Sequence, residues 1–277
     1  MDILQAIVIG IIEGFTEFLP ISSTGHMIVA SEFLEIEQSA LFKAYEVIIQ
    51  FAAILAVMLL YREKINFKEI TLWSKIMGAF FPLAIIGFLL KDWVKEIFVV
   101  ETVAWMFIIG GIIFIVVEYF HKDEEKVSQE VEEITWRQAM SIGFAQVLSL
   151  VPGTSRAGST IIAGMLSGVS RKASTEFSFL LAIPVMMAVS GYELLKHYQD
   201  FVGADLTAFV VGFVVAFVVA YITIKMFIVF LQRFTFVAFG IYRIIFGIIL
   251  LMILYKDSPI VVSILQFLQF VVHSFTR

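Results

Sequence analysis

The stretch EGFTEFLPISSTGH, residues 13–26, decides how this sequence is interpreted, because it places carboxylates, hydroxyls and an imidazole within an apolar segment. Of the 277 residues, 60% are hydrophobic and only 16% are charged, and the mean hydropathy is +0.97. Soluble domains carry about 25% charged residues. The composition therefore predicts an integral membrane protein that lies within the lipid bilayer, and no nucleic-acid partner is expected.

Apolar runs approaching the length that crosses a bilayer, about 20 residues, recur along the chain with no soluble domain between them. They cover residues 44–60, 77–90, 102–117, 206–224 and 236–254. Four shorter pieces, 3–19, 27–36, 138–151 and 161–169, flank Pro/Gly/Ser turns. Such pieces predict re-entrant hairpins, whose irregular backbone must be surrounded by protein or by a watery cavity. The first piece lacks a basic n-region and a cleavage site, so we expect mature protein and not a signal peptide.

The two regions of short pieces resemble each other, and the likeness continues downstream, where GIIFIVVEY (111–119) resembles GIILLMILY (247–255). The fold predicted is an all-α polytopic membrane protein in which two five-helix halves form an inverted-topology repeat, with a re-entrant hairpin from each half meeting near the midplane. In one transmembrane domain we expect repeat 1 at about 1–120, a solvated charged linker at 121–137, repeat 2 at 138–255 and an extra apolar segment at 256–277. The matched positions in the hairpins are Gly10, Glu13, Pro20 and Ser23 with Gly143, Gln146, Pro152 and Ser155.

Basic residues predict the orientation. Arg62, Lys64, Lys68 and Lys75 follow the third predicted element, which places that segment in the cytoplasm by the positive-inside rule. The first hairpin then enters from the outer side, the loop 91–100 lies outside, and the second hairpin enters from the cytoplasm. We therefore expect a multi-pass protein of the cell membrane whose site opens to the outer side.

The first hairpin carries two carboxylates, Glu13 and Glu17, which are four residues apart and share one helix face. An acidic residue near mid-bilayer costs about 2.5–3.5 kcal/mol, so the pair predicts a polar cavity or bound partners. Both carboxylates are candidate ligands for a divalent cation, Mg²⁺ or Ca²⁺, because hard oxygen ligands suit these ions. The alternative is that Glu17 caps or pairs with a neighbouring segment.

Hydroxyls and an imidazole follow Pro20, with Ser22 and Ser23 four and three residues before His26. A helix that begins at the serines would present its first amides to phosphate. A nucleophilic hydroxyl, a base and an orienting carboxylate form the general arrangement for covalent catalysis. The alternative is a serine N-cap with a hydrogen-bonded core histidine.

The second hairpin, VPGTSRAGST (151–160), supplies a fixed positive charge in Arg156, whose planar guanidinium suits phosphate oxygens. Gly153 and Gly158 imitate the spacing of a nucleotide P-loop, but Ser159 stands where that motif needs lysine, so we expect only an anion-binding turn. Pairing of Arg156 with Glu13 or Glu17 is the alternative. The residues predicted to bind a substrate phosphate are Ser22, Gly153, Ser155, Arg156 and Thr160.

Together, EGFTEFLPISSTGH and PGTSRAGST resemble the two signature motifs of the undecaprenyl-diphosphatase, or bacitracin-resistance protein, family over about residues 1–255. The resemblance implies hydrolysis of a polyprenyl diphosphate lipid, undecaprenyl diphosphate, to undecaprenyl phosphate and inorganic phosphate, which recycles the carrier for peptidoglycan synthesis. It also implies an inverted repeat of two five-helix halves. Oligomeric state stays open.

Carried onto this chain, the family's motifs imply the catalytic residues Glu13, Glu17, Ser23, His26 and Arg156. We predict Ser23 as nucleophile, His26 as proton acceptor, Glu17 as orienting or metal-binding group and Arg156 as the group that neutralises phosphate. His26 as nucleophile is an alternative. One departure is Ala157, where the family usually has a second serine after the arginine.

A second function fits the same pattern: a transporter or lipid-carrier translocase, since inverted repeats with broken helices are transporter architecture. Transport needs no nucleophile, so dependence on Ser23 and His26 separates the two. Arg243 is predicted to be a snorkelling or interfacial residue. Glu46, Gln50 and Glu176 could border the site or serve structural hydrogen bonding.

Overall fold

The computed structural model describes residues 1–37, 39–120, 128–201, 206–231 and 233–256. Within these residues the secondary structure is helical apart from one isolated bridge between Ser128 and Val169. Six helices of the described part are long and apolar enough to cross a membrane, which agrees with the predicted polytopic all-α protein. They are α3 (Ala40–Leu60), α4 (Ile70–Leu89), α6 (Val100–Phe120), α9 (Arg171–Phe201), α10 (Thr207–Leu231) and α11 (Val237–Leu254).

The remaining helices are shorter. α1 (Ile3–Thr16) and α2 (Ser23–Phe33) form one helical hairpin, and α7 (Trp136–Gln146), with η4 (Val147–Leu150), and α8 (Arg156–Leu166) form another. α1 begins at an Asp2/Gln5 capping box and α7 at a Thr135/Gln138 capping box, in which side chains satisfy free backbone amides. Three further short helices are η1 (Phe67–Glu69), α5 (Lys91–Glu96) and η3 (Val131–Glu133).

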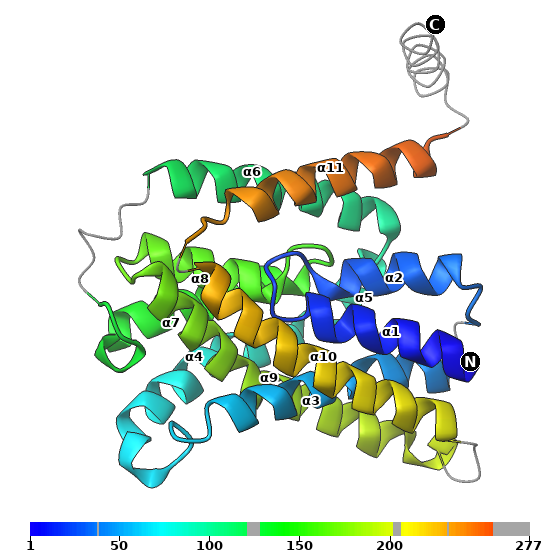
Figure 1. Cartoon of the computed structure of the whole chain (residues 1–277), viewed down its shortest axis with the longest axis horizontal. Coiled ribbons are helices and arrows are strands. Elements are labelled where there is room, and N and C mark those ends of the chain that lie inside the picture. Colours follow the sequence, from blue (N-terminus) through cyan, green and yellow to red (C-terminus); the bar gives the residue numbers. More distant parts are fainter. Residues whose placement is uncertain (38, 121–127, 202–205, 232, 257–277) are drawn as a thin grey trace, which may run out of the picture.

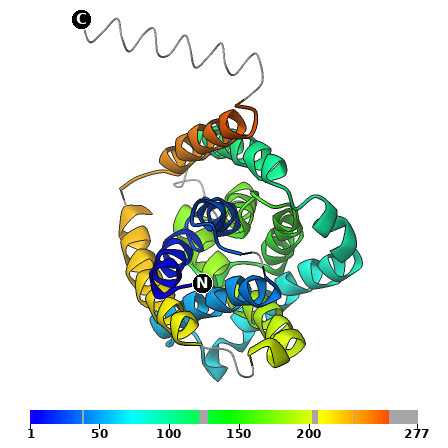
Figure 2. The same cartoon turned by 90° about the vertical axis from the view of Figure 1, so that its right-hand side faces the viewer.

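The two hairpins occupy the middle of the molecule and approach from opposite ends, so that their turns meet near its centre (Figure 1). α6 and α11 pack together on one side of them, and α3, α9 and α10 lie on the other side (Figures 1 and 2). α1 packs along α10, and α7 packs along α4. A Cβ atom added at Gly14 of α1 would lie 2.5 Å from the carbonyl oxygen of Ala216, so glycine permits this close approach.

Aromatic side chains pack around the hairpins. Phe18, in the first turn, is fully buried and meets Phe179 of α9 edge to face, with 5.3 Å between ring centroids. By contrast, many large apolar side chains of the long helices are exposed, among them Ile241, Ile245 and Ile248 on α11. Exposed apolar surface on this scale marks contact with another apolar phase, which for helices of this length is lipid.

A buried ion pair ties three long helices together away from the hairpin turns. Arg171, at the start of α9, donates to Glu118 of α6, and the other oxygen of Glu118 accepts the backbone N–H of Phe236 at the start of α11, at 3.0 Å. The Glu118 side chain is 4% exposed and the Arg171 side chain 16%. This ion pair connects α6, α9 and the start of α11.

The predicted linker at 121–137 lies partly outside the described residues, which resume at Ser128. Its second half packs onto the helices: Val131 and Ile134 are fully buried, and Glu132 accepts a 2.5 Å hydrogen bond from Lys64. Glu132 and Glu133 between them are exposed to solvent. The predicted extra segment at 256–277 lies outside the described residues except for Lys256.

Candidate active site

Each hairpin turn ends in a serine with an unusual backbone. Ser22 caps α2 with a φ of 69° and Ser155 caps α8 with a φ of 74°. Side chains other than glycine rarely adopt this conformation, which costs on the order of 1–3 kcal/mol and is concentrated at functional sites. The sequence comparison paired Ser23 with Ser155, whereas the structure pairs Ser22 with Ser155, because these two serines hold the same place before their helices.

The helices that follow begin at the two residues predicted to carry chemistry, Ser23 and Arg156. The first amides of a helix have no partner within it and favour an anion. In α8 the Ser155 hydroxyl accepts one of these amides, that of Gly158, at 3.1 Å. Ser22 makes no such side-chain bond, so the amides at the start of α2 have no side-chain cap.

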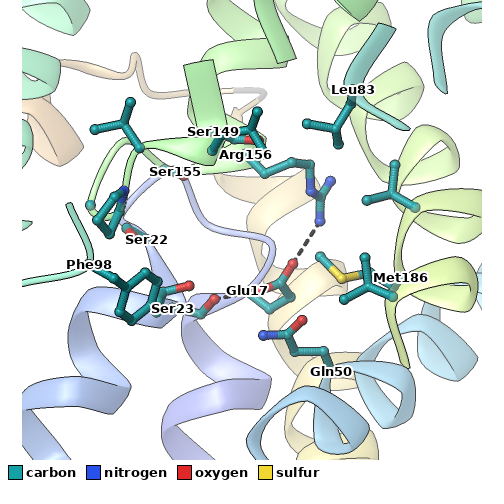
Figure 3. A pocket seen from close by; sticks show the side chains of 17 residues that line it. Glu17, Ser22, Ser23, Gln50, Leu83, Phe98, Ser149, Ser155, Arg156 and Met186 are labelled. Carbon is teal, nitrogen blue, oxygen red and sulfur yellow. Dashed lines mark hydrogen bonds and ion pairs between the residues drawn. The ribbon is translucent and has the colours of Figure 1, made fainter. Parts of the chain in front are cut away.

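A cavity of about 160 Å³ lies between the two turns (Figure 3). Six of the residues that the sequence predicts for the site line it: Glu17, Ser22, Ser23, Gly153, Ser155 and Arg156. Three polar residues absent from that prediction also line it: Thr24, Gln50 and Ser149. Gln50 had been considered as a border residue on the basis of its place in an apolar helix, whereas Thr24 in α2 and Ser149 in η4 carried no signal beyond a hydroxyl close to a hairpin turn.

Glu17 is the centre of the hydrogen bonding in this cavity. The Ser23 hydroxyl donates to Glu17 Oε2 at 2.5 Å, and Arg156 Nη2 donates to Glu17 Oε1 at 2.8 Å (Figure 3). The Glu17 side chain is 5% exposed and that of Arg156 is 8%. Arg156 Nη1 donates to the Ser178 carbonyl at 2.9 Å. One carboxylate therefore joins a hydroxyl from one hairpin to a guanidinium from the other.

Glu13 lies one helical turn before Glu17 and is fully buried, but it does not line the cavity. Neither of its carboxylate oxygens has a hydrogen-bond partner among the described residues. Its carboxylate interacts electrostatically with the side chains of Glu17, Glu46 and Arg156. Unpartnered carboxylate oxygens are the donors that a hard divalent cation takes. In the described part of the chain no three His, Asp or Glu side chains form a metal-binding group, so the protein would contribute two carboxylates at most to such an ion.

His26 faces away from the cavity. Its Nδ1 lies 2.8 Å from the Ser22 carbonyl oxygen, its Nε2 lies 2.6 Å from the Tyr242 hydroxyl oxygen, and its ring stacks on Phe246. It lines a second cavity of about 640 Å³ with apolar walls from α1, α2 and α11. Because both ring nitrogens are engaged on that side, this arrangement does not bring His26 to the Ser23 hydroxyl.

Thr160 is likewise turned away from the cavity. Its hydroxyl donates to the Arg156 carbonyl at 2.9 Å and lies 2.7 Å from the Ser178 hydroxyl oxygen. It therefore supports the first turn of α8. Glu176 does not line the cavity, and its Oε2 lies 3.5 Å from Lys64 Nζ.

The prediction for Arg243 is wrong. Its side chain is fully buried and does not reach an interface. α11 packs against α6 along this face, so the guanidinium points inward to backbone carbonyls of the turns. A single basic residue in an apolar run carries no sequence signal that separates these two directions.

The protein is therefore a polytopic membrane protein that buries a serine, a carboxylate and an arginine between two helical hairpins. In comparison with known proteins, residues 6–249 match the family described as Bacitracin resistance protein BacA. The chain belongs to this family.

Similar proteins carry consistent names. The chain is 71% identical over 254 residues, 92% of this chain and 100% of the relative, to an undecaprenyl-diphosphatase of Sulfurovum sp. (strain NBC37-1). It is 61% identical over 91% of its length to an undecaprenyl-diphosphatase of Sulfurimonas denitrificans, 99% of which is covered. It is 57% identical over 92% of its length to undecaprenyl-diphosphatase 2 of Pseudoalteromonas translucida, which is covered completely.

Proposed function

We propose that this protein is a membrane phosphatase that hydrolyses undecaprenyl diphosphate to undecaprenyl phosphate and inorganic phosphate. The observation that carries the proposal is the 2.5 Å hydrogen bond from the Ser23 hydroxyl to Glu17, within a cavity that also holds the Arg156 guanidinium. The names of the relatives support the same substrate. Returning the monophosphate carrier to peptidoglycan synthesis links this activity to the bacitracin resistance in the family's description.

In the first step, Ser23 Oγ attacks the terminal phosphorus while its proton passes to Glu17 Oε2. The bond between that phosphorus and the bridging oxygen breaks, and undecaprenyl phosphate leaves with the bonding electrons. A hydroxyl is a weak nucleophile until a neighbouring base accepts its proton. The role that the sequence suggested for His26 thus falls to Glu17, because Glu17 already accepts the Ser23 hydroxyl and His26 does not reach it.

In the second step, water attacks the phosphorus of the phosphorylated Ser23, the bond between that phosphorus and Ser23 Oγ breaks, and Oγ takes back the proton held by Glu17. Inorganic phosphate leaves with the oxygen and the protons of the water. Arg156 and the amides at the starts of α2 and α8 stabilise the charge on the phosphoryl oxygens in both steps. The guanidinium is held by Glu17 and by the Ser178 carbonyl, so its position is set before substrate arrives. Preorganised donors of this kind do not have to reorient during the reaction.

A trapped intermediate separates the two candidate nucleophiles. Labelled substrate, quenched rapidly and in parallel with acid and with base, should yield phosphate bound to a peptide that contains residues 13–26. A phosphoserine survives acid, whereas a phosphohistidine is lost in acid and survives base. Acid-stable label that disappears in Ser23→Ala supports the mechanism above, and acid-labile label that disappears in His26→Ala assigns the nucleophile to His26.

The carboxylates also suit a divalent cation. Glu13 has two unpartnered oxygens, whereas both oxygens of Glu17 are engaged by Ser23 and Arg156. Mg²⁺ is typically held by one or two carboxylates together with substrate phosphates. When bound, such an ion would be held by Glu13 together with Glu17, the carboxylate that lines the cavity, and would neutralise charge on the diphosphate.

The helix pairing supports an inverted repeat. α1 packs along α10 of the other half, and α7 packs in the same way along α4, while α3 pairs with α9 and α6 with α11. These are the pairs that a two-fold axis between residues 1–120 and 138–255 would create. In this arrangement the hairpins are re-entrant. Phe98, in the segment that the positive-inside rule assigns to the outer side, lines the cavity, which supports an opening toward that side.

Phosphate release from undecaprenyl diphosphate by the detergent-purified protein tests the proposal. Wild-type protein should hydrolyse the lipid, and Ser23→Ala and Arg156→Ala should each lose at least about a hundredfold in kcat, the scale of a lost catalytic group. Folding of each variant is verified by thermal unfolding. Wild-type protein that binds the lipid but releases no phosphate, with or without Mg²⁺ or Ca²⁺, would instead support a translocase, and a lipid-flip assay in vesicles would then test that function.

A further inference from the structure

Arg243 is a fully buried cation that the mechanism does not use. It lies on α11, outside both hairpins, and does not line the cavity. Burying a guanidinium is costly unless its N–H groups find acceptors, and both Nη atoms of Arg243 find them, whereas Nε does not. The acceptors here are backbone carbonyls, because no carboxylate pairs with Arg243 in the described part of the chain.

Two of these carbonyls come from the two hairpin turns, at equivalent places. Arg243 Nη1 donates to the Pro20 carbonyl at 3.1 Å, and Nη2 donates to the Gly153 carbonyl at 2.9 Å. Pro20 is three residues before Ser23, and Gly153 is three residues before Arg156. One planar side chain therefore binds both turns. In each turn the carbonyl that it binds lies three residues before the side chain that contacts Glu17, which is Ser23 in the first turn and Arg156 in the second.

The surrounding helices are shaped to keep the guanidinium in place. Nη2 also donates to the Met106 carbonyl of α6 at 2.9 Å. The ring centroids of Phe107 and Phe114 lie 5.2 and 5.4 Å from its Cζ atom, within the range of cation–π attraction. A side chain at Gly110 would overlap the guanidinium. The glycine thus leaves the space that Arg243 fills.

We propose that Arg243 is a positioning residue that locks the two hairpin turns to each other and thereby sets the Ser23, Glu17 and Arg156 geometry. The inference rests on the proposed function in so far as that geometry is catalytic. Lysine cannot replace arginine in this role, because a single ammonium group lacks the rigid fork that reaches two carbonyls in one plane. A misplacement of about 1 Å at reacting groups can cost a hundredfold in rate.

Arg243→Lys tests the proposal with two readouts. The first is phosphate release: kcat should fall about 10- to 100-fold, while binding of a non-hydrolysable diphosphate lipid changes less than about threefold, because Arg156 keeps its charge and partners. The second is amide hydrogen exchange, which reports local opening. Peptides covering residues 18–26 and 150–158 should both exchange faster than in wild type, whereas peptides from α3 and α9 should not.

Gly110→Ala perturbs the same contact without changing Arg243, because its new methyl group displaces the guanidinium. It should reproduce the fall in kcat and the faster exchange of both turns. Matched controls are Arg233→Lys, which changes an exposed arginine, and Gly191→Ala, where an added Cβ meets no atom within 4 Å. Both should keep wild-type kcat and exchange.

The outcomes separate the two proposals. Wild-type protein that releases no phosphate defeats the proposed function, and the exchange of the two turns still decides the role of Arg243. Wild-type kcat or unchanged turn exchange in Arg243→Lys overturns the positioning role, as does faster exchange spread evenly over all helices. If Arg243→Lys does not fold, the same criteria apply to Gly110→Ala.

Discussion

Replacing Glu17 by glutamine tests the centre of the proposed mechanism, because the amide keeps the size of the side chain but cannot accept the Ser23 proton. Loss of a general base costs about 10²- to 10⁴-fold, which corresponds to roughly 2.7–5.4 kcal/mol in the activation barrier. The change also breaks an ion pair whose side chains are 5% and 8% exposed. Removing one partner of a buried pair costs about 3–5 kcal/mol of stability.

The stability cost of Glu17→Gln should lie near the lower end of that range, about 3 kcal/mol. The glutamine oxygen still accepts from Arg156, and Arg156 keeps its 2.9 Å hydrogen bond to the Ser178 carbonyl. The two effects are separable, since one is read from kcat and the other from thermal unfolding in detergent.

Glu118→Gln is the matched control, because it makes the same substitution in another buried arginine pair. Glu118 is paired with Arg171 and does not line the cavity. It should lose a similar amount of stability, about 3–5 kcal/mol, and keep wild-type kcat in the folded fraction. Glu17→Gln that retains more than a tenth of wild-type kcat would refute the base role. An equal loss of kcat in Glu118→Gln would show that breaking an ion pair alone explains the defect.

Three further predictions test neighbouring parts of the structure. Tyr242→Phe removes the hydrogen bond to His26 Nε2 on the side away from Ser23, so kcat should stay within about threefold of wild type. A loss of about a hundredfold, the scale of a lost catalytic group, would show that His26 takes part in the reaction. Chelation with EDTA should stop phosphate release, and added Mg²⁺ should restore it. Glu13→Gln should need at least tenfold more Mg²⁺ for its half-maximal rate. Activity that survives EDTA would remove the cation from the mechanism. Gly14→Ala places a Cβ 2.5 Å from the Ala216 carbonyl oxygen and should destabilise the protein by about 1–3 kcal/mol, read as a lower unfolding temperature; an unchanged temperature would mean that α1 and α10 separate without cost.

Much of the architecture was predictable because apolar length and turn residues act locally. The run 102–117 became α6 (Val100–Phe120), and the short pieces before Pro20 and Pro152 became α1 and α7. The arginine, serine and acidic pair of the two motifs were also identifiable, since ionisable residues in apolar segments need a polar environment. These features depend on residue type and spacing within one segment.

Side-chain direction was not predictable in the same way. His26 and Ser23 are three residues apart on one helix, yet one lines an apolar cavity and the other lines the cavity with Glu17. Which face of α2 meets which cavity depends on how the hairpin is set against α6 and α11. A pattern of residue types in a short helix with mixed polar and apolar faces does not contain that information.

A membrane-embedded helical protein with two polar turns was predictable from the sequence, because burial of charge and the length of apolar runs follow from composition and order. The packing of the helices was needed to show that Glu17, and not His26, accepts the hydrogen bond from the Ser23 hydroxyl, and that Arg243 contacts both turns. The contacts of Arg243 join segments that are far apart in the sequence, since Arg243 on α11 and Pro20 in the first turn lie 223 positions apart. Contacts of this kind are set by how helices pack in three dimensions.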